Sequence, residues 1–149
     1  MNEAYVFHCS PTKQQKCLTN MLVSATAQEF ATMQQNIQPN TNILLYNLKT
    51  SELFFGLVPT AKPMLSKSNH RDGHPAKIRI KPLHQSSRLV LRATLHGATS
   101  SSLKRIGLVQ LSTLPNFVSK SLSLLREVDD IHTVPLLAPG VRAEPPEPA

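Results

Sequence analysis

The chain has 149 residues, of which 40% are hydrophobic, and its formal net charge at pH 7 is +7. This length allows one compact domain and is too short for two full ones. No run of apolar residues approaches the roughly eighteen that a membrane-spanning helix needs, so a helical membrane protein is excluded.

The two ends of the chain indicate its compartment and the limits of its domain. Met1–Glu3 leads into a strand-like segment without the basic region and apolar stretch of a signal peptide, so we expect a cytoplasmic or nuclear protein. Cys9 and Cys17 are then expected to be reduced, partly buried thiols, although their separation also permits a disulfide. Prolines gather near the C-terminus. We therefore expect one domain over residues 4–126 and a flexible, acidic, proline-rich tail over residues 127–149.

The first expected elements are a strand over Ala4–Cys9 and a helix that begins at Ser10 and Pro11. Ser10 supplies a capping hydroxyl, and proline suits the first helical position. An apolar stripe at helical spacing continues this helix: Cys17, Leu18, Met21 and Leu22. A second helix is expected after Thr26, because Glu29 three residues later completes the capping-box pattern.

A β-hairpin follows the second helix. Ile43–Asn47 and Leu53–Val58 are apolar and aromatic runs, and a five-residue turn over residues 48–52 joins them. The hairpin contains three of the seven Tyr and Phe residues, so we expect it at the centre of the core. Its aromatic side chains are expected to be buried, although Tyr46 and Phe54 beside the turn could alternate outward.

After a polar loop over residues 62–74, three strands and a closing helix are expected. The strands fall at Ala76–Lys81, Arg88–Leu95 and Ile106–Leu111, with a flexible turn over residues 97–102. The closing helix keeps one apolar face: Leu114, Val118, Leu122 and Leu125. Together these elements predict a single α/β (α+β) domain. Its sheet is expected to be bent, mainly antiparallel and barrel-like, with five or six strands and about three flanking helices.

Positive charge is concentrated in the middle of the chain. Residues 62–105 contain ten lysines and arginines against one acid, Asp72, so this segment carries about +9. The alternation over Ala76–Lys81 places three cations on one face of a strand: Lys77, Arg79 and Lys81. They recur about every 6.5–7 Å, which is similar to the phosphate spacing of an extended single strand.

Three further cations could join this face. Arg88 and Arg92 would extend it if their strand lies beside the first, and Arg71 precedes it in the polar loop. The alternative interpretation is a solvated outer face whose charge prevents pairing with other chains. A further alternative is that the acidic tail folds back and screens the charge.

No residue pattern indicates catalysis or metal binding. Between Glu52 and Glu127 the sequence has a single acid, so paired carboxylates and a nucleophile–His–acid arrangement have no support. The glycine patterns of a nucleophile elbow and a phosphate loop are absent from the sequence. His70 and His74 are four residues apart, but they lie in a polar loop where solvated histidines are the default. We expect no enzyme activity, metal or cofactor.

The order of these segments resembles the DCD (development and cell death) domain. The matching segments are Ala4–Phe7, Cys17–Leu18, Leu44–Asn47, Leu53–Leu57 and Pro75–Arg79, followed by the closing helix. The resemblance covers about residues 4–126 and identifies the chain as a divergent member, or as a neighbour within a wider group of similar α/β barrels. It departs from the family pattern at Leu22–Ala25, where the family has Phe-Gly, and at Asn40, where the family has Gly after proline. The chain also has no Trp.

The resemblance implies a non-enzymatic interaction module of stress response or cell death, with no catalytic residues to transfer. Its partner would be a protein or a single-stranded RNA bound through the basic face. The fold is more distantly similar to PUA and YTH domains, which bind RNA. Because a methylated-base cage normally uses tryptophan, recognition of methylated bases is excluded. The alternative function is a basic RNA-binding subunit of a ribonucleoprotein assembly.

Overall fold

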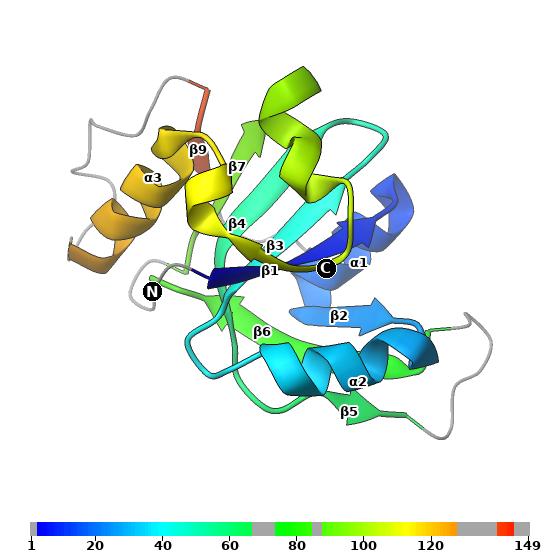
Figure 1. Ribbon diagram of the computed structural model, residues 1–149. Helices are drawn as coiled ribbons and strands as arrows, with labels where there is room; N and C mark the ends of the chain where they lie inside the picture. Colours follow the sequence, from blue (N-terminus) through cyan, green and yellow to red (C-terminus); the bar gives the residue numbers. More distant parts are fainter. Residues whose placement is uncertain (1–2, 67–73, 85–87, 128–139, 145–149) are drawn as a thin grey trace.

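The computed structural model describes residues 3–66, 74–84, 88–127 and 140–144, and it shows a mixed α/β architecture (Figure 1). Its helices are α1 (Pro11–Asn20), α2 (Ala27–Asn36), α3 (Asn116–Glu127) and the 3-10 helices η1 (Gly97–Leu103) and η2 (Leu111–Thr113). Its strands are β1 (Glu3–Cys9), β2 (Leu22–Ala25), β3 (Asn42–Asn47), β4 (Glu52–Pro59), β5 (Met64–Leu65), β6 (Ala76–Pro82), β7 (Val90–Thr94), β8 (Gly107–Gln110) and β9 (Arg142–Glu144). None of the described helices is long and apolar enough to cross a membrane.

The strand pairing is mainly antiparallel, as predicted, but the sheet is larger than expected. Its order is β2-β6-β4-β3-β1-β8, with β5 beside β6, β7 beside β4 and β9 beside β7. The parallel pair is β1 with β3, because α1, β2 and α2 form the crossover between these strands. Within the described ranges no pairing joins β8 to β2, so the sheet is open and the predicted barrel-like closure is not shown.

The central strands are buried on both faces. Along β1, Ala4 and Val6 pack into a cluster with α3, whereas Tyr5 and Phe7 pack into a second cluster with α1 and α2. Figure 1 shows α3 on one side of these strands and α2 on the other. Strands buried in this way carry continuous apolar runs, because each side chain enters one of two cores.

The hairpin aromatics are buried, which confirms the main prediction for them. Tyr46, Phe54 and Phe55 are at most 3% exposed. The Tyr46 hydroxyl donates a hydrogen bond to the Leu95 carbonyl at 2.9 Å, so its polar atom is satisfied inside the core. The outward orientation considered for Tyr46 and Phe54 is wrong, because the sheet has a core on each face.

A bend at Gly56 divides β4 between two partners. The first half of the strand, Glu52–Phe55, pairs with β7, and the second half, Leu57–Pro59, pairs with β6. Gly56 has a φ of +79°, which favours glycine. A Cβ added here would lie 3.0 Å from Leu125 Cδ1 of α3. Both the backbone conformation and the close approach of α3 therefore select glycine.

The first two helices begin where the sequence predicts, but α1 ends earlier. Ser10 Oγ accepts a hydrogen bond from Lys13 N at 3.2 Å, which confirms the predicted cap. Met21 adopts a left-handed φ of +50° and ends α1, so Leu22 starts β2 instead of extending the helical stripe. The Thr26 side chain makes no capping hydrogen bond, so the capping-box prediction for α2 is wrong.

Three segments predicted to be irregular contain regular structure. β5 lies in the polar loop and pairs with β6, and the turn predicted over residues 97–102 is η1. β9 lies within the segment predicted as a flexible tail, and it pairs with β7. Val141 beside β9 is 8% exposed and packs in the cluster with α3. The rest of the predicted tail, residues 128–139 and 145–149, lies outside the described residues.

We predict that Gly56→Ala lowers the free energy of unfolding by about 2–4 kcal/mol, because it adds a left-handed-backbone penalty and a clash with Leu125. Gly97→Ala is the matched control. Gly97 also has a positive φ, +60°, but a Cβ there meets nothing within 4 Å. Gly97→Ala should lower the free energy of unfolding by about 1 kcal/mol, as measured by urea denaturation. Equal costs at the two sites would contradict the close packing of α3 on the bend.

We predict that Val141→Ala costs about 2 kcal/mol of unfolding free energy, because it removes two methyl groups from the core. Val109→Ala in β8 is the control, because Val109 is only partly buried against the same cluster and should cost less. Thermal or urea denaturation of both variants measures the difference. A Val141→Ala protein as stable as the wild type would show that the segment around β9 does not belong to the core.

Candidate polyanion-binding surface

The alternation predicted for β6 is present in the structure. Ala76, Ile78 and Ile80 are at most 3% exposed and belong to the core cluster shared with α1 and α2. Three cations project from the opposite side of the strand, and we call them the basic face: Lys77, Arg79 and Lys81. The structure therefore places on one face the three cations that the alternation in the sequence predicted there.

The neighbours of β6 determine how each cation of the basic face is presented. Arg79 is exposed, whereas Lys77 and Lys81 are half-buried. Lys77 lies opposite Ser24 of β2, and its Nζ donates a hydrogen bond to Ser24 Oγ at 2.8 Å. Arg79 and Lys81 have no carboxylate partner within the described residues. The basic face therefore has two cations whose charge no described acid neutralises.

The structure does not place Arg92 on the basic face. β7 pairs with the first half of β4 and β6 with the second half, so the two strands do not lie side by side. Arg92 forms a salt bridge with Glu52, and its guanidinium carbon lies 5.4 Å from the centroid of the Phe54 ring. Phe54 belongs to the core from which the basic face points away. The condition under which Arg92 was expected to extend this face, a strand beside β6, is therefore not met.

The other two predicted cations have different outcomes. Arg88 is exposed in the connection between β6 and β7 with a φ of +54°, so it precedes β7 instead of starting the strand. Its backbone N donates a hydrogen bond to the His84 carbonyl at 3.0 Å. Arg71 lies outside the described residues.

A second group of cations, which the sequence analysis missed, lies next to the basic face. α1 contributes Lys13 and Lys16 to a cavity of about 330 Å³ that Lys77 also lines, and we call this cavity the lysine pocket. His8, Asn20 and Ser24 provide further polar groups in its wall. The spacing of Lys13, Lys16 and Asn20 places them on one side of a helix. That signal was available in the sequence, but the approach of α1 to β6 was not.

Two buried thiols lie in the wall of the lysine pocket. Burial raises the pKa of Cys9 to about 12, with smaller contributions from Cys17 and Glu52. Burial also raises the pKa of Cys17, although the Ser24 backbone, Lys13 and Lys77 act in the opposite direction. Both cysteines are buried and free, as expected. Because their pKa values are raised, they lack the thiolate character of a nucleophile.

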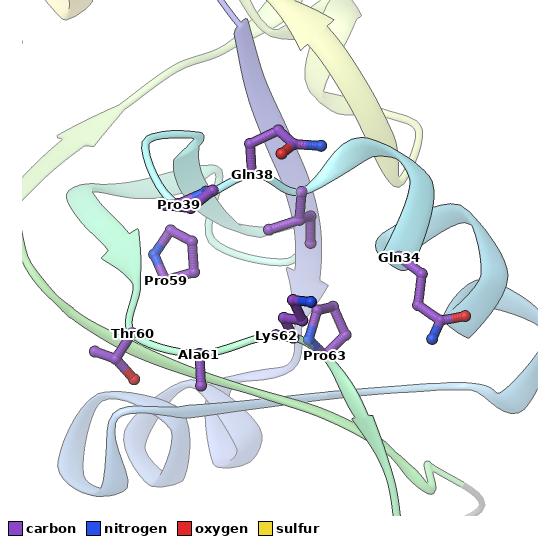
Figure 2. A pocket seen from close by; sticks show the side chains of 9 residues that line it. Gln34, Gln38, Pro39, Pro59, Thr60, Ala61, Lys62 and Pro63 are labelled. Atoms are coloured by element: carbon purple, nitrogen blue, oxygen red, sulfur yellow. The ribbon is translucent and has the colours of Figure 1, made fainter.

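Two larger cavities lie near the other end of the basic face. The first cavity has a volume of about 450 Å³, and Lys81 and Arg126 line it. The second has a volume of about 550 Å³. The two cavities share three lining residues: Pro39, Pro59 and Thr60. Figure 2 shows Pro39 and Pro59 on one side of the larger cavity and Gln34 on the opposite side. Its charged residue within the described part of the chain is Lys62. Prolines, amides and a single cation favour a neutral ligand over a polyanion.

Within the described ranges, no three His, Cys, Asp or Glu side chains gather as a metal site would require. His74 lies beside Lys13, whose Nζ donates a hydrogen bond to its Nδ1 at 3.0 Å, and His70 is outside the described residues. No protein-family model matches the chain, and neither a curated protein nor a solved structure matches it.

We predict that Ellman's reagent labels both thiols slowly at pH 8 in the folded protein and rapidly in urea, because the raised pKa keeps them protonated. The thiol has its ordinary pKa of 9.0 in the unfolded chain, whereas burial raises the pKa of Cys9 to about 12 in the folded protein. The contribution of Cys9 to stability is therefore full below pH 9 and is lost as pH rises toward 12.

Urea denaturation across this pH range should show the loss, and Cys9→Ala should reduce it. Any decline that remains in Cys9→Ala comes from other groups, among them Tyr5, whose pKa is likewise raised to about 12 by burial and Glu29. An unchanged alkaline decline in Cys9→Ala, or rapid labelling of the folded wild type, would contradict the assigned environment of the thiols.

Proposed function

We propose that this protein is a non-enzymatic interaction module that binds single-stranded RNA through the basic face. The observation that carries the proposal is the outward row of Lys77, Arg79 and Lys81 on β6. Their side chains recur about every 6.5–7 Å along the strand, a period close to that of phosphates in an extended chain. Phosphate contacts of this kind supply affinity with little dependence on base sequence.

The surroundings of the basic face support a polyanion over a merely solvated strand. β6 lies between β2 and β4, so its cations are not needed to block an open sheet edge. Lys13 and Lys16 continue the positive surface from another element. Clustering of cations from several elements on one face is the electrostatic signature of a nucleic-acid-binding protein.

The mode of binding follows from where the aromatic rings lie. Tyr5, Phe7, Tyr46, Phe54 and Phe55 are all buried, so these rings are not available to stack on bases. RNA contact then depends on charge and hydrogen bonding and has little selectivity for base sequence. The resemblance to the DCD domain remains a prediction, and it agrees with an interaction module.

A protein partner is the competing proposal. The proline-lined cavity in Figure 2, at about 550 Å³, is large enough to accept part of a peptide. A peptide held there would depend on apolar contact with Pro39 and Pro59, and its binding would persist at moderate salt. RNA bound on the basic face would dissociate as salt increases, because each neutralised phosphate releases counterions.

We predict that a fluorescein-labelled oligouridylate binds the wild-type protein and that affinity falls about 20-fold between about 50 and about 200 mM salt, as three phosphate contacts require. Fluorescence polarisation measures both affinities. Reversing the basic face with Lys77→Glu, Arg79→Glu and Lys81→Glu should weaken binding by at least about tenfold, because attraction becomes repulsion.

The matched control reverses three exposed cations on other elements: Lys49, Arg105 and Lys120. This variant has the same net charge as the first, so it separates local contact from overall charge. Circular dichroism melting of both variants checks that each remains folded. The proposal fails if wild-type protein does not bind at low salt, or if the two variants lose equal affinity.

A further inference from the structure

The lysine pocket has features that the proposed function does not use. It opens between α1 and β2, beside the end of the basic face that carries Lys77. Its volume of about 330 Å³ falls within the usual range for sites that enclose a small molecule. The basic face, in contrast, is a strand surface that can contact a ligand from one side only.

The charge of the pocket selects an anion. Lys13, Lys16 and Lys77 line it, and no carboxylate does so among the described residues. Burial raises the pKa of the Cys17 thiol, and Lys13 and Lys77 lie close enough to act on it in the opposite direction. Their positive potential therefore extends into the pocket wall. A mobile anion that enters the pocket would experience the same potential.

The polar groups of the pocket suit an anion with several acceptor oxygens. Lys77 Nζ lies 2.8 Å from Ser24 Oγ, so an ammonium and a hydroxyl meet at one point of the wall. Lys13 Nζ is held 3.0 Å from His74 Nδ1, which restrains the Lys13 side chain. Asn20 contributes an amide from the last turn of α1. These donors come from three elements, as in sites that surround a phosphate.

The remaining wall of the pocket is apolar. Leu22, Val23 and Leu45 line it together with the protonated thiols. An inorganic anion would leave this surface against water, whereas a phosphate attached to a sugar would cover it. The volume corresponds to about ten water molecules, enough for a phosphate and the ribose joined to it.

We infer that the lysine pocket binds the terminal phosphomonoester of a nucleotide. At neutral pH a phosphomonoester carries a charge between about −1.5 and −2 and three terminal oxygens, whereas an internal phosphodiester carries one charge and has two such oxygens. Three lysines therefore favour the end of a strand over its interior. Lys77 belongs to both the pocket and the basic face, so a strand along β6 can place its terminal phosphate in the pocket.

The inference rests on the proposed function for its RNA partner, and the test separates the two. Two oligouridylates of equal length, both labelled at the 3′ end, carry either a 5′-phosphate or a 5′-hydroxyl. A third oligonucleotide, labelled at the 5′ end, carries a 3′-phosphate. Fluorescence polarisation at low salt should show about tenfold tighter binding when the strand carries a phosphate at the end, 5′ or 3′, that enters the lysine pocket.

The variant that tests the site is Lys13→Gln with Lys16→Gln, because neither residue belongs to the basic face. It should remove the preference for a terminal phosphate, so that the 5′-phosphate and 5′-hydroxyl strands bind with equal affinity, while the loss of two positive charges weakens the binding of both. Lys49→Gln with Lys120→Gln is the matched control and should retain the preference. If the double variant is unstable in circular dichroism, Lys16→Gln alone replaces it, because Lys16 is exposed.

The outcomes distinguish binding in the lysine pocket from binding on the basic face. Equal affinity for strands with and without terminal phosphates overturns the pocket and leaves RNA binding by the basic face intact. A preference that persists in the lysine variant also overturns it. Failure of every strand to bind overturns the proposed function. In that case, uridine monophosphate binding in calorimetry that depends on Lys13 and Lys16 supports a site for free nucleotides, and its absence overturns the pocket as well.

Discussion

The arrangement of the sheet depends on the bend at Gly56. A regular β4 would present one continuous edge to a single partner, but here the strand changes from β7 to β6 within two residues. The change needs a left-handed backbone and room for Leu125 of α3, and only glycine provides both at low cost. The Leu83 backbone N donates a hydrogen bond to the Gly56 carbonyl at 2.7 Å and secures the connection after β6.

Because of this bend, β6 and β7 lie in different parts of the molecule. β7 stays with the first half of β4, where Arg92 pairs with Glu52 and contributes to structure. β6 pairs with β2 through its first half and with β4 through its second half, with one side on the core and the other side carrying the basic face. α1 follows β1 and covers the neighbouring part of the sheet, which brings Lys13 and Lys16 to Lys77. The positive surface is thus a product of topology as well as of composition.

The sequence predicts the long elements well because their apolar runs have a clear period. β1, β3, β4, β6 and α3 lie close to where the patterns place them. β2, β5 and β9 were not predicted, since two to four residues cannot display a period and their pairing is decided by distant partners. Met21 illustrates the limit: it continues the apolar spacing of α1, yet its left-handed conformation ends the helix there.

The candidate surface was predicted in part for the same reason. Alternation along β6 is a local property, so Lys77, Arg79 and Lys81 could be assigned to one face from the sequence. Whether Arg92 joins them depends on the partner of β7, and the contribution of Lys13 depends on where α1 packs. The spacing of residues along the sequence predicts neither the partner of β7 nor the packing of α1. The sequence therefore indicates the centre of the basic surface, and the tertiary structure defines its extent.

Amide chemical-shift mapping of the isotope-labelled protein with a short oligouridylate tests the location of binding most directly. RNA bound as proposed should shift the amides of β6 and its neighbours in β2 and leave those of Val118 and Leu122 in α3 unchanged, because these residues pack on the other face of the central strands. Shifts that gather instead around Gln34 and Gln38, at the cavity of Figure 2, would contradict binding on the basic face.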